Sequence, residues 1–147
     1  LINAITFNED GKVIFRNKFV QTDEFKVDMQ MGGFSARGIF GTKKSGGLME
    51  NVFDMKVKNV ANTNLIVCGD KLLALWEGGV PYELDPKTLA TIGKRDDIET
   101  SFSAHPRFDP RKNVWVNHGV GDPDPVSGST DIFLYEIGAD NGAVTSK

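Results

Sequence analysis

Hydrophobic alternation with a period of two residues is the feature that most constrains the fold of this chain. Residues 1–7 and 12–20 are both strand-like, and the pair Asp10-Gly11 lies between them. An Asp-Gly pair between two β-rich runs is a strong hairpin signal. Short strands with turn signals every 8–12 residues are typical of a sandwich, barrel or propeller. The sequence therefore predicts an all-β fold.

Residues 63–88 combine these signals into a unit like a propeller blade. A strand, the turn Gly69-Asp70 and a return strand are followed by Gly78-Gly79, a third strand, an Asp-Pro turn and a further strand. Since a blade takes about 40–50 residues, the 147 residues hold roughly three blades. A closed propeller needs about four or more. We therefore expect residues 1–147 to be one partial propeller domain without an internal boundary, an internal piece of a longer protein.

Helical periodicity is not apparent anywhere in the chain. Residues 21–36 mix charged residues, methionines and glycines, and we expect them to be extended or loop-like. Residues 114–116 and 132–135 predict two later strands, and the Pro- and Gly-containing residues 121–128 predict a loop between them.

Composition excludes several classes of function. The net charge is −3, without a run rich in lysine and arginine, which argues against binding to nucleic acid. Cys68 is the single cysteine, so the chain forms no internal disulfide and no cysteine-based zinc site. Because it lies in an apolar run, we expect it to be a small buried hydrophobe.

His105 is the strongest candidate for chemistry. Pro106 biases its backbone toward extended geometry, and neutral imidazole is a common metal ligand. Metal-bound histidines usually donate their other ring N–H to a carboxylate, and Glu77, at the end of an apolar strand, is the candidate partner. Taken alone, a His-Pro pair is more often structural, and a glutamate before Gly-Gly is usually a solvated turn residue. His118 has no evident partner and is interpreted as structural.

Three ordered motifs add a family resemblance to these observations. Residues 58–64, 72–89 and 102–110 resemble the carotenoid cleavage oxygenases, and residues 15–25 and 37–42 are similar to upstream segments of the same family. The family includes bacterial apocarotenoid oxygenases, plant epoxycarotenoid dioxygenases and the vertebrate retinoid isomerohydrolase. The resemblance implies a seven-bladed β-propeller with a non-haem ferrous iron on its axis, held by four histidines.

The resemblance also implies roles for four residues. His105 matches the first iron ligand, and Glu77 matches the first of the glutamates that orient ligand histidines, acting on a histidine of another blade rather than on His105. Thr63 matches a residue that crowds a vacant coordination position in the apocarotenoid-cleaving members, whereas the isomerohydrolase has a valine there. Trp76 resembles an aromatic residue of the substrate tunnel, although strand alternation sends Trp76 and Glu77 to opposite faces. The other three iron ligands have no counterpart here and are expected beyond Lys147.

Three functions follow as expectations for the whole protein. The first is an iron(II)-dependent dioxygenase that cleaves a double bond of a carotenoid or apocarotenoid with O2, giving aldehyde or ketone products. The second is a retinoid isomerohydrolase, which Thr63 disfavours. The third is a carotenoid-binding propeller without catalysis. The chain by itself is expected to be inactive, because a metal site needs several ligands. Peripheral membrane contact and a plastid or cytoplasmic location are compatible with the resemblance.

Overall fold

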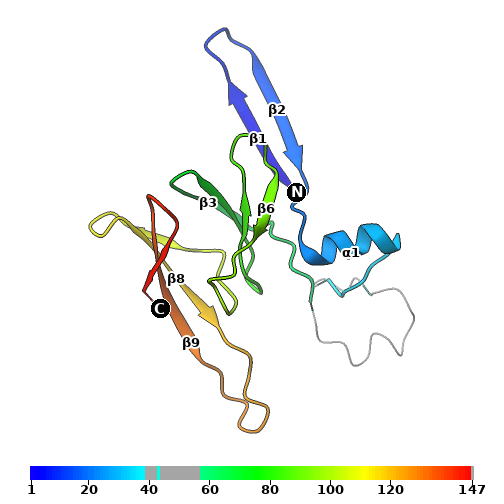
Figure 1. The fold of residues 1–147 in the computed structure, drawn as a ribbon, viewed down its shortest axis with the longest axis vertical. Coiled ribbons are helices and arrows are strands. Elements are labelled where there is room, and N and C mark those ends of the chain that lie inside the picture. The colour runs from blue at the N-terminus through cyan, green and yellow to red at the C-terminus, as the bar shows by residue number, and fades with distance from the viewer. Residues whose placement is uncertain (39–42, 44–56, 147) are drawn as a thin grey trace.

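The computed structural model describes residues 1–38, 43 and 57–146. In these residues the chain forms an antiparallel hairpin and two four-stranded antiparallel sheets (Figure 1). Residues 39–42, which complete the upstream segment 37–42, lie outside the described residues. The all-β prediction is therefore confirmed, and the hairpin and the two four-stranded sheets correspond to the roughly three blades expected.

The strands follow one another as meanders. The hairpin pairs β1 (Ile2–Phe7) with β2 (Val13–Lys18). The first sheet has the order β3-β4-β5-β6 and consists of β3 (Asn64–Cys68), β4 (Lys71–Leu75), β5 (Tyr82–Leu84) and β6 (Thr91–Lys94). The second has the order β10-β9-β8-β7 and consists of β7 (Arg107–Asp109), β8 (Val114–Val120), β9 (Ile132–Gly138) and β10 (Val144–Ser146).

Turn chemistry sets the registers that the sequence predicts. Phe7 pairs with Val13 across the turn that contains Asp10-Gly11, and Gly11 has a φ of 80°. Cys68 pairs with Lys71 across Gly69-Asp70, where Gly69 has a φ of 62°. Only glycine adopts such angles without a steric cost from Cβ.

The prediction for residues 21–36 is wrong, because they contain helix α1 (Asp23–Met31). Thr22 caps its first turn by accepting a hydrogen bond from the Phe25 N–H, and Gly32 ends it with a φ of 64°. No helical residue is fully buried, so the helix has no apolar stripe to read from the sequence. The capping threonine and the two acidic residues after it were the available signals. In the described residues no helix has the length and apolar character needed to cross a membrane.

Strand β4 lies at the centre of the core and is buried on both faces. Its alternate residues belong to two hydrophobic clusters, one between the two four-stranded sheets and one beneath the N-terminal segment. The cluster between the sheets consists of Ile66, Cys68, Leu73, Leu75, Ile98, Phe102, Ala104, Tyr135 and Ile137. Cys68 is fully buried, as expected, and burial raises the pKa of its thiol, which keeps it protonated and unreactive.

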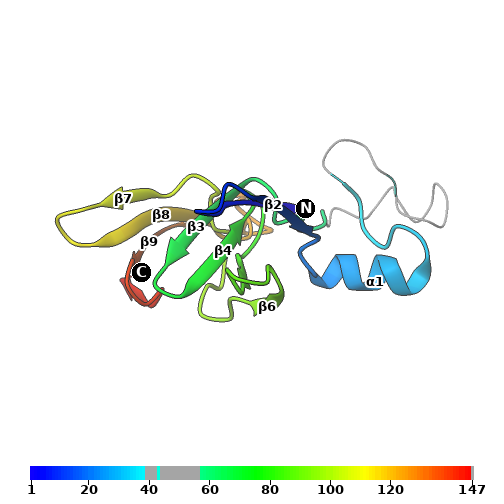
Figure 2. The same ribbon diagram turned by 90° about the horizontal axis from the view of Figure 1, so that it is seen from above.

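The N-terminal hairpin and helix α1 lie at the margin of this core. Figures 1 and 2 show the hairpin extending away from the two sheets and α1 lying to one side of them. Apolar side chains of the hairpin are exposed, among them Ile5, Phe7 and Phe15. An exposed apolar hairpin is a surface on which further chain can pair or pack.

Candidate active site

A tight turn after β4 carries two of the four candidate residues. Trp76 forms an isolated antiparallel bridge with Phe102, and the Gly79 N–H donates to the Trp76 carbonyl at 3.4 Å. A Cβ on Gly78 would lie 2.6 Å from the Trp76 ring, and one on Gly79 would lie 2.5 Å from Asn59 Nδ2. The Gly-Gly pair is therefore required by the indole and the amide that pack against the turn.

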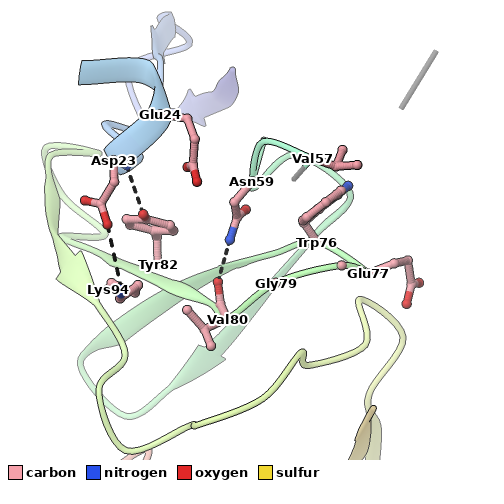
Figure 3. A pocket seen from close by; sticks show the side chains of 11 residues that line it. Asp23, Glu24, Val57, Asn59, Trp76, Glu77, Gly79, Val80, Tyr82 and Lys94 are labelled. Atoms are coloured by element: carbon pink, nitrogen blue, oxygen red, sulfur yellow. Dashed lines mark hydrogen bonds and ion pairs between the residues drawn. The ribbon is translucent and has the colours of Figure 1, made fainter. Parts of the chain in front are cut away.

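Trp76 and Glu77 point to opposite sides, as strand alternation predicts. Trp76 is 6% exposed, whereas the Glu77 side chain is 48% exposed. In Figure 3 the Trp76 ring lies near Asn59, and the Glu77 carboxylate points away from Tyr82 and Lys94. The two side chains therefore differ in burial, although both residues line the same cavity beside α1.

His105 lies within reach of Glu77. Its Nε2 is 2.9 Å from Glu77 Oε1, and its side chain is 70% exposed. Exposure makes the pair weak as a stabilising interaction. The contact places a carboxylate on an imidazole nitrogen, which is the arrangement that fixes the tautomer of metal-binding histidines. The structure thus shows Glu77 paired with His105, as the residues alone suggested. The pairing that the resemblance implies joins Glu77 to a ligand histidine of another blade.

Thr63 lies at the same end of the first sheet. Its N–H donates to the Leu75 carbonyl at 3.0 Å, which places it beside the end of β4, and the residue is exposed. The next residue, Asn64, donates its amide to the Ala104 carbonyl at 2.8 Å. Thr63, Trp76, Glu77 and His105 are therefore gathered at one end of the β3–β6 sheet, although they come from three separate segments.

Sequence reasoning missed two asparagines that contact the segment before His105. Asn64 is at the start of β3, and Asn117 is inside β8. Asn117 Nδ2 donates to the Ser103 carbonyl at 2.7 Å. Asparagine is depleted in strands, so an asparagine in an apolar strand was the signal that could have identified Asn117. His118, beside it, contributes its carbonyl to Ser103 N–H at 2.9 Å.

A cavity of about 730 Å³ lies on the Trp76 side of the turn, between α1 and the first sheet (Figure 3). Asp23, Lys94 and Tyr82 line it, and the Asp23 N–H donates to the Tyr82 hydroxyl at 3.0 Å. Burial raises the pKa of Tyr82 to about 12, so this hydroxyl stays neutral. His105 does not line this cavity, and its charged lining is unsuited to a hydrocarbon substrate.

The described donor groups do not by themselves form a complete metal site. In residues 1–38, 43 and 57–146 no group of three or more His, Cys, Asp and Glu side chains is placed to hold an ion. His105 offers one exposed imidazole with a carboxylate beside it, which suits a single ligand of a larger site. A metal centre that includes His105 therefore requires ligands from other parts of a larger protein.

Comparison with known proteins gives one consistent assignment. The profile of the retinal pigment epithelial membrane protein family matches residues 1–147. Apocarotenoid-15,15'-oxygenase of Synechocystis is 45% identical over 116 residues, which is 75% of this chain and 24% of that protein. The chloroplastic carotenoid cleavage dioxygenase 7 of Oryza sativa is 41% identical over 90 residues (59% and 14%). An isoeugenol monooxygenase of Pseudomonas putida is 35% identical over 123 residues (81% and 25%).

Solved structures agree with the sequence matches. A Synechocystis apocarotenoid oxygenase variant superimposes with a TM-score of 0.82 and 37% identity, covering 97% of this chain and 31% of that one. Other structures of that oxygenase include a cobalt-substituted form and variants of a threonine, a tryptophan and the glutamate that follows it. Those three positions have the same spacing as Thr63, Trp76 and Glu77.

The chain spans about a quarter of the length of the Synechocystis oxygenase. Within that span the fold, the order of the motifs and the spacing of the candidate residues all agree with one group of enzymes. The chain belongs to the retinal pigment epithelial membrane protein family, which includes the carotenoid and apocarotenoid oxygenases.

Proposed function

We propose that the whole protein is an iron(II)-dependent dioxygenase that cleaves one double bond of a carotenoid or apocarotenoid. Both atoms of O2 enter the products, so the C=C bond is broken and two carbonyl groups form. The observation that carries this proposal is the 45% identity to a Synechocystis apocarotenoid oxygenase over 75% of the chain. The cobalt-substituted form of that oxygenase supports a metal cofactor for the family.

Each candidate residue has a distinct task in this proposal. His105 supplies one imidazole to the iron, and three further histidines of the whole protein complete the set, as the resemblance implies. Glu77 holds a ligand histidine of another blade in orientation and raises its basicity, as the resemblance implies. In this chain its carboxylate lies 2.9 Å from His105. The bound iron supplies the activation of O2, which no side chain of this chain provides.

Thr63 and Trp76 shape the space around that centre. Thr63 is exposed beside the end of β4 and restricts access to one side of the metal. Trp76 lies against Gly78 and Gly79 and fixes the turn that presents Glu77. The structure places Trp76 on the side opposite Glu77, so we assign it this packing role in addition to the tunnel contact that the resemblance implies.

The test uses the full-length protein with a panel of an apocarotenoid, a full-length carotenoid and isoeugenol. We expect about one iron per protein and two carbonyl products from the polyene, each labelled when ¹⁸O2 is supplied. His105→Ala should abolish both iron loading and cleavage, and Arg111→Ala, on the exposed turn between β7 and β8, is the matched surface control. Full iron loading without cleavage of any polyene would contradict the proposal.

Isoeugenol in the panel addresses a second substrate class. An isoeugenol monooxygenase is 35% identical to this chain, and that name concerns a double bond conjugated to an aromatic ring. Cleavage of isoeugenol with no turnover of polyenes would show that the substrate is an aryl alkene and not a carotenoid. Isomerisation and ester hydrolysis of a retinoid without incorporation of ¹⁸O would instead favour the isomerohydrolase. A metal-free full-length protein that binds carotenoid would favour the non-catalytic propeller.

The chain alone is proposed to be inactive, because it provides one of the ligands that an iron site needs. The whole protein is proposed to take its apolar substrate from a membrane surface by peripheral contact. A plastid or a cytoplasmic location is compatible with this route, and one relative is named as chloroplastic. Co-sedimentation of the full-length protein with vesicles tests the membrane contact.

A further inference from the structure

The segment that carries His105 combines a buried backbone with an exposed ring. Phe102 and Ala104 are fully buried and Ser103 is 5% exposed, whereas the His105 side chain is 70% exposed. Phe102 N–H donates to the carbonyl of Gly79, which is labelled in Figure 3, at 3.1 Å. A side chain that projects from a rigid, buried backbone has its position set by the backbone rather than by its own packing.

Two asparagine side chains hold the carbonyl groups that precede His105. Asn64 Nδ2 donates to the Ala104 carbonyl at 2.8 Å, and Asn117 Nδ2 donates to the Ser103 carbonyl at 2.7 Å. The two asparagines come from different sheets, because Asn64 is in β3 and Asn117 is in β8. The segment is therefore fixed from both sheets at two successive peptide groups.

Ser103 completes this arrangement from within the segment. Its Oγ accepts the His105 N–H at 3.2 Å, and its own N–H donates to the His118 carbonyl at 2.9 Å. Asn117 thus acts on Ser103, which in turn contacts the backbone of His105. These contacts define the direction in which the Cα–Cβ bond of His105 leaves the backbone.

Asn117 is an energetically unfavourable residue for a buried position in the interior of a strand. It is 5% exposed, and in the described residues its Oδ1 is buried without a hydrogen-bond donor. A leucine, which has the same branching at Cγ, would remove this unsatisfied oxygen. Local rules that are broken in a core usually serve a function, and within the described part of the chain the one hydrogen bond of the Asn117 side chain is the bond to Ser103.

We propose that Asn64 and Asn117 are positioning residues that set the placement of His105 as a metal ligand by holding the carbonyls of Ala104 and Ser103. The inference rests on the proposed function, since it assumes that His105 binds iron. Loss of an outer contact of this kind typically weakens metal binding about 10- to 100-fold.

The experiment measures metal binding by the full-length protein without relying on turnover. The variants are Asn117→Leu and Asn64→Ala, and the control is Asn113→Gly. Asn113 lies on the turn between β7 and β8, and its Nδ2 donates to Asp140 Oδ2 at 2.7 Å, a hydrogen bond that the control removes. Glycine suits the φ of 55° at Asn113. The readouts are the iron(II) Kd from anaerobic chelator competition, the absorption spectrum of the Co²⁺-loaded protein, and the melting temperature of the metal-free protein.

We expect Asn117→Leu and Asn64→Ala each to raise the iron(II) Kd about 10- to 100-fold and to alter the Co²⁺ spectrum. We expect Asn113→Gly to change neither. A purely structural role would instead lower the melting temperature and leave the spectrum unchanged, which would overturn the inference. If Asn117→Leu does not fold, Asn64→Ala alone decides.

The two proposals fail in different ways. If the unsubstituted protein takes up no iron, the proposed function fails and the inference falls with it. If the unsubstituted protein and both asparagine variants bind iron with the same Kd and the same Co²⁺ spectrum, only the inference fails.

Discussion

Gly69→Ala is expected to separate the two four-stranded sheets at the turn where they meet. Gly69 lies between β3 and β4 with a φ of 62°, and its N–H donates to the Ala139 carbonyl at 2.6 Å. A Cβ at this position would lie 1.9 Å from the backbone oxygen of Asp140. Because backbone oxygen cannot move aside like a flexible side chain, the β9–β10 turn must shift away.

The expected cost can be worked out from two contributions. An L-residue in the left-handed region costs roughly 1–2 kcal/mol, and the displaced turn loses a hydrogen bond worth about 1 kcal/mol. We therefore expect Gly69→Ala to lower the free energy of unfolding by about 2–3 kcal/mol. Gly11→Ala is the matched control, since Gly11 has a φ of 80° and nothing within 4 Å of its Cβ position. It should cost only the roughly 1–2 kcal/mol of backbone strain.

The assay is urea denaturation of the full-length protein, followed by circular dichroism and by hydrogen exchange of peptides that cover residues 64–75 and 138–143. Gly69→Ala should speed exchange in both peptides, because both sides of the contact loosen. Gly11→Ala should leave both peptides protected. Equal losses of stability in the two variants, with protection retained at residues 138–143, would refute the steric argument.

Three further changes test the packing and the charges around the site. Trp76→Ala should lower the free energy of unfolding by roughly 3 kcal/mol or more, because the buried indole packs against the turn. A loss under about 1 kcal/mol, measured by urea denaturation, would contradict this packing role. The hydrogen bond from Arg95 lowers the pKa of Asp97 below 3.8 in the folded protein. The stabilising effect of the Asp97 carboxylate is therefore complete above pH 3.8 and is lost as the pH falls through the lower, folded pKa. Asp97→Asn should make the melting temperature depend less on pH in that acid range, and an unchanged acid profile would contradict this prediction. Burial raises the pKa of Tyr82 from 10.0 to about 12, so its contribution is complete below pH 10 and is lost as the pH rises toward 12. Tyr82→Phe should remove the late step of the tyrosinate absorbance titration, near pH 12, and leave the earlier part unchanged. A late step of unchanged size in the variant would contradict this.

Local sequence was sufficient for the hairpins and insufficient for the helix. Asp10-Gly11 and Gly69-Asp70 predicted turns that the structure contains, since positive φ and alternating strands are local properties. Helix α1 was missed because it buries no residue fully, so its period is invisible, and its stability depends on the Thr22 cap. The short strands β7 and β10 were also missed: each has only three residues, and neither has a glycine pair and an Asp-Pro turn around it such as those that marked the equally short β5.

The candidate residues and the pairing of His105 with Glu77 were predicted from residue type and motif, but the asparagines that hold the segment before His105 were not. The sequence singled out His105 and Glu77, and the structure shows their contact at 2.9 Å. Asn64 and Asn117 were not found, because their partners are backbone carbonyls about 14 to 40 residues away, which leave no mark on the side-chain pattern.

The sequence by itself determined the β-strand periodicity, the two tight turns and the identity of the side chains available for chemistry, because each depends on neighbouring residues. Tertiary structure alone decided that the ends of β3 and β4 meet the segment before His105. It also decided that Asn117 gives up one hydrogen bond in the core to hold that segment. These outcomes depend on how two sheets pack, and such long-range contacts are set by the whole fold rather than by any local pattern.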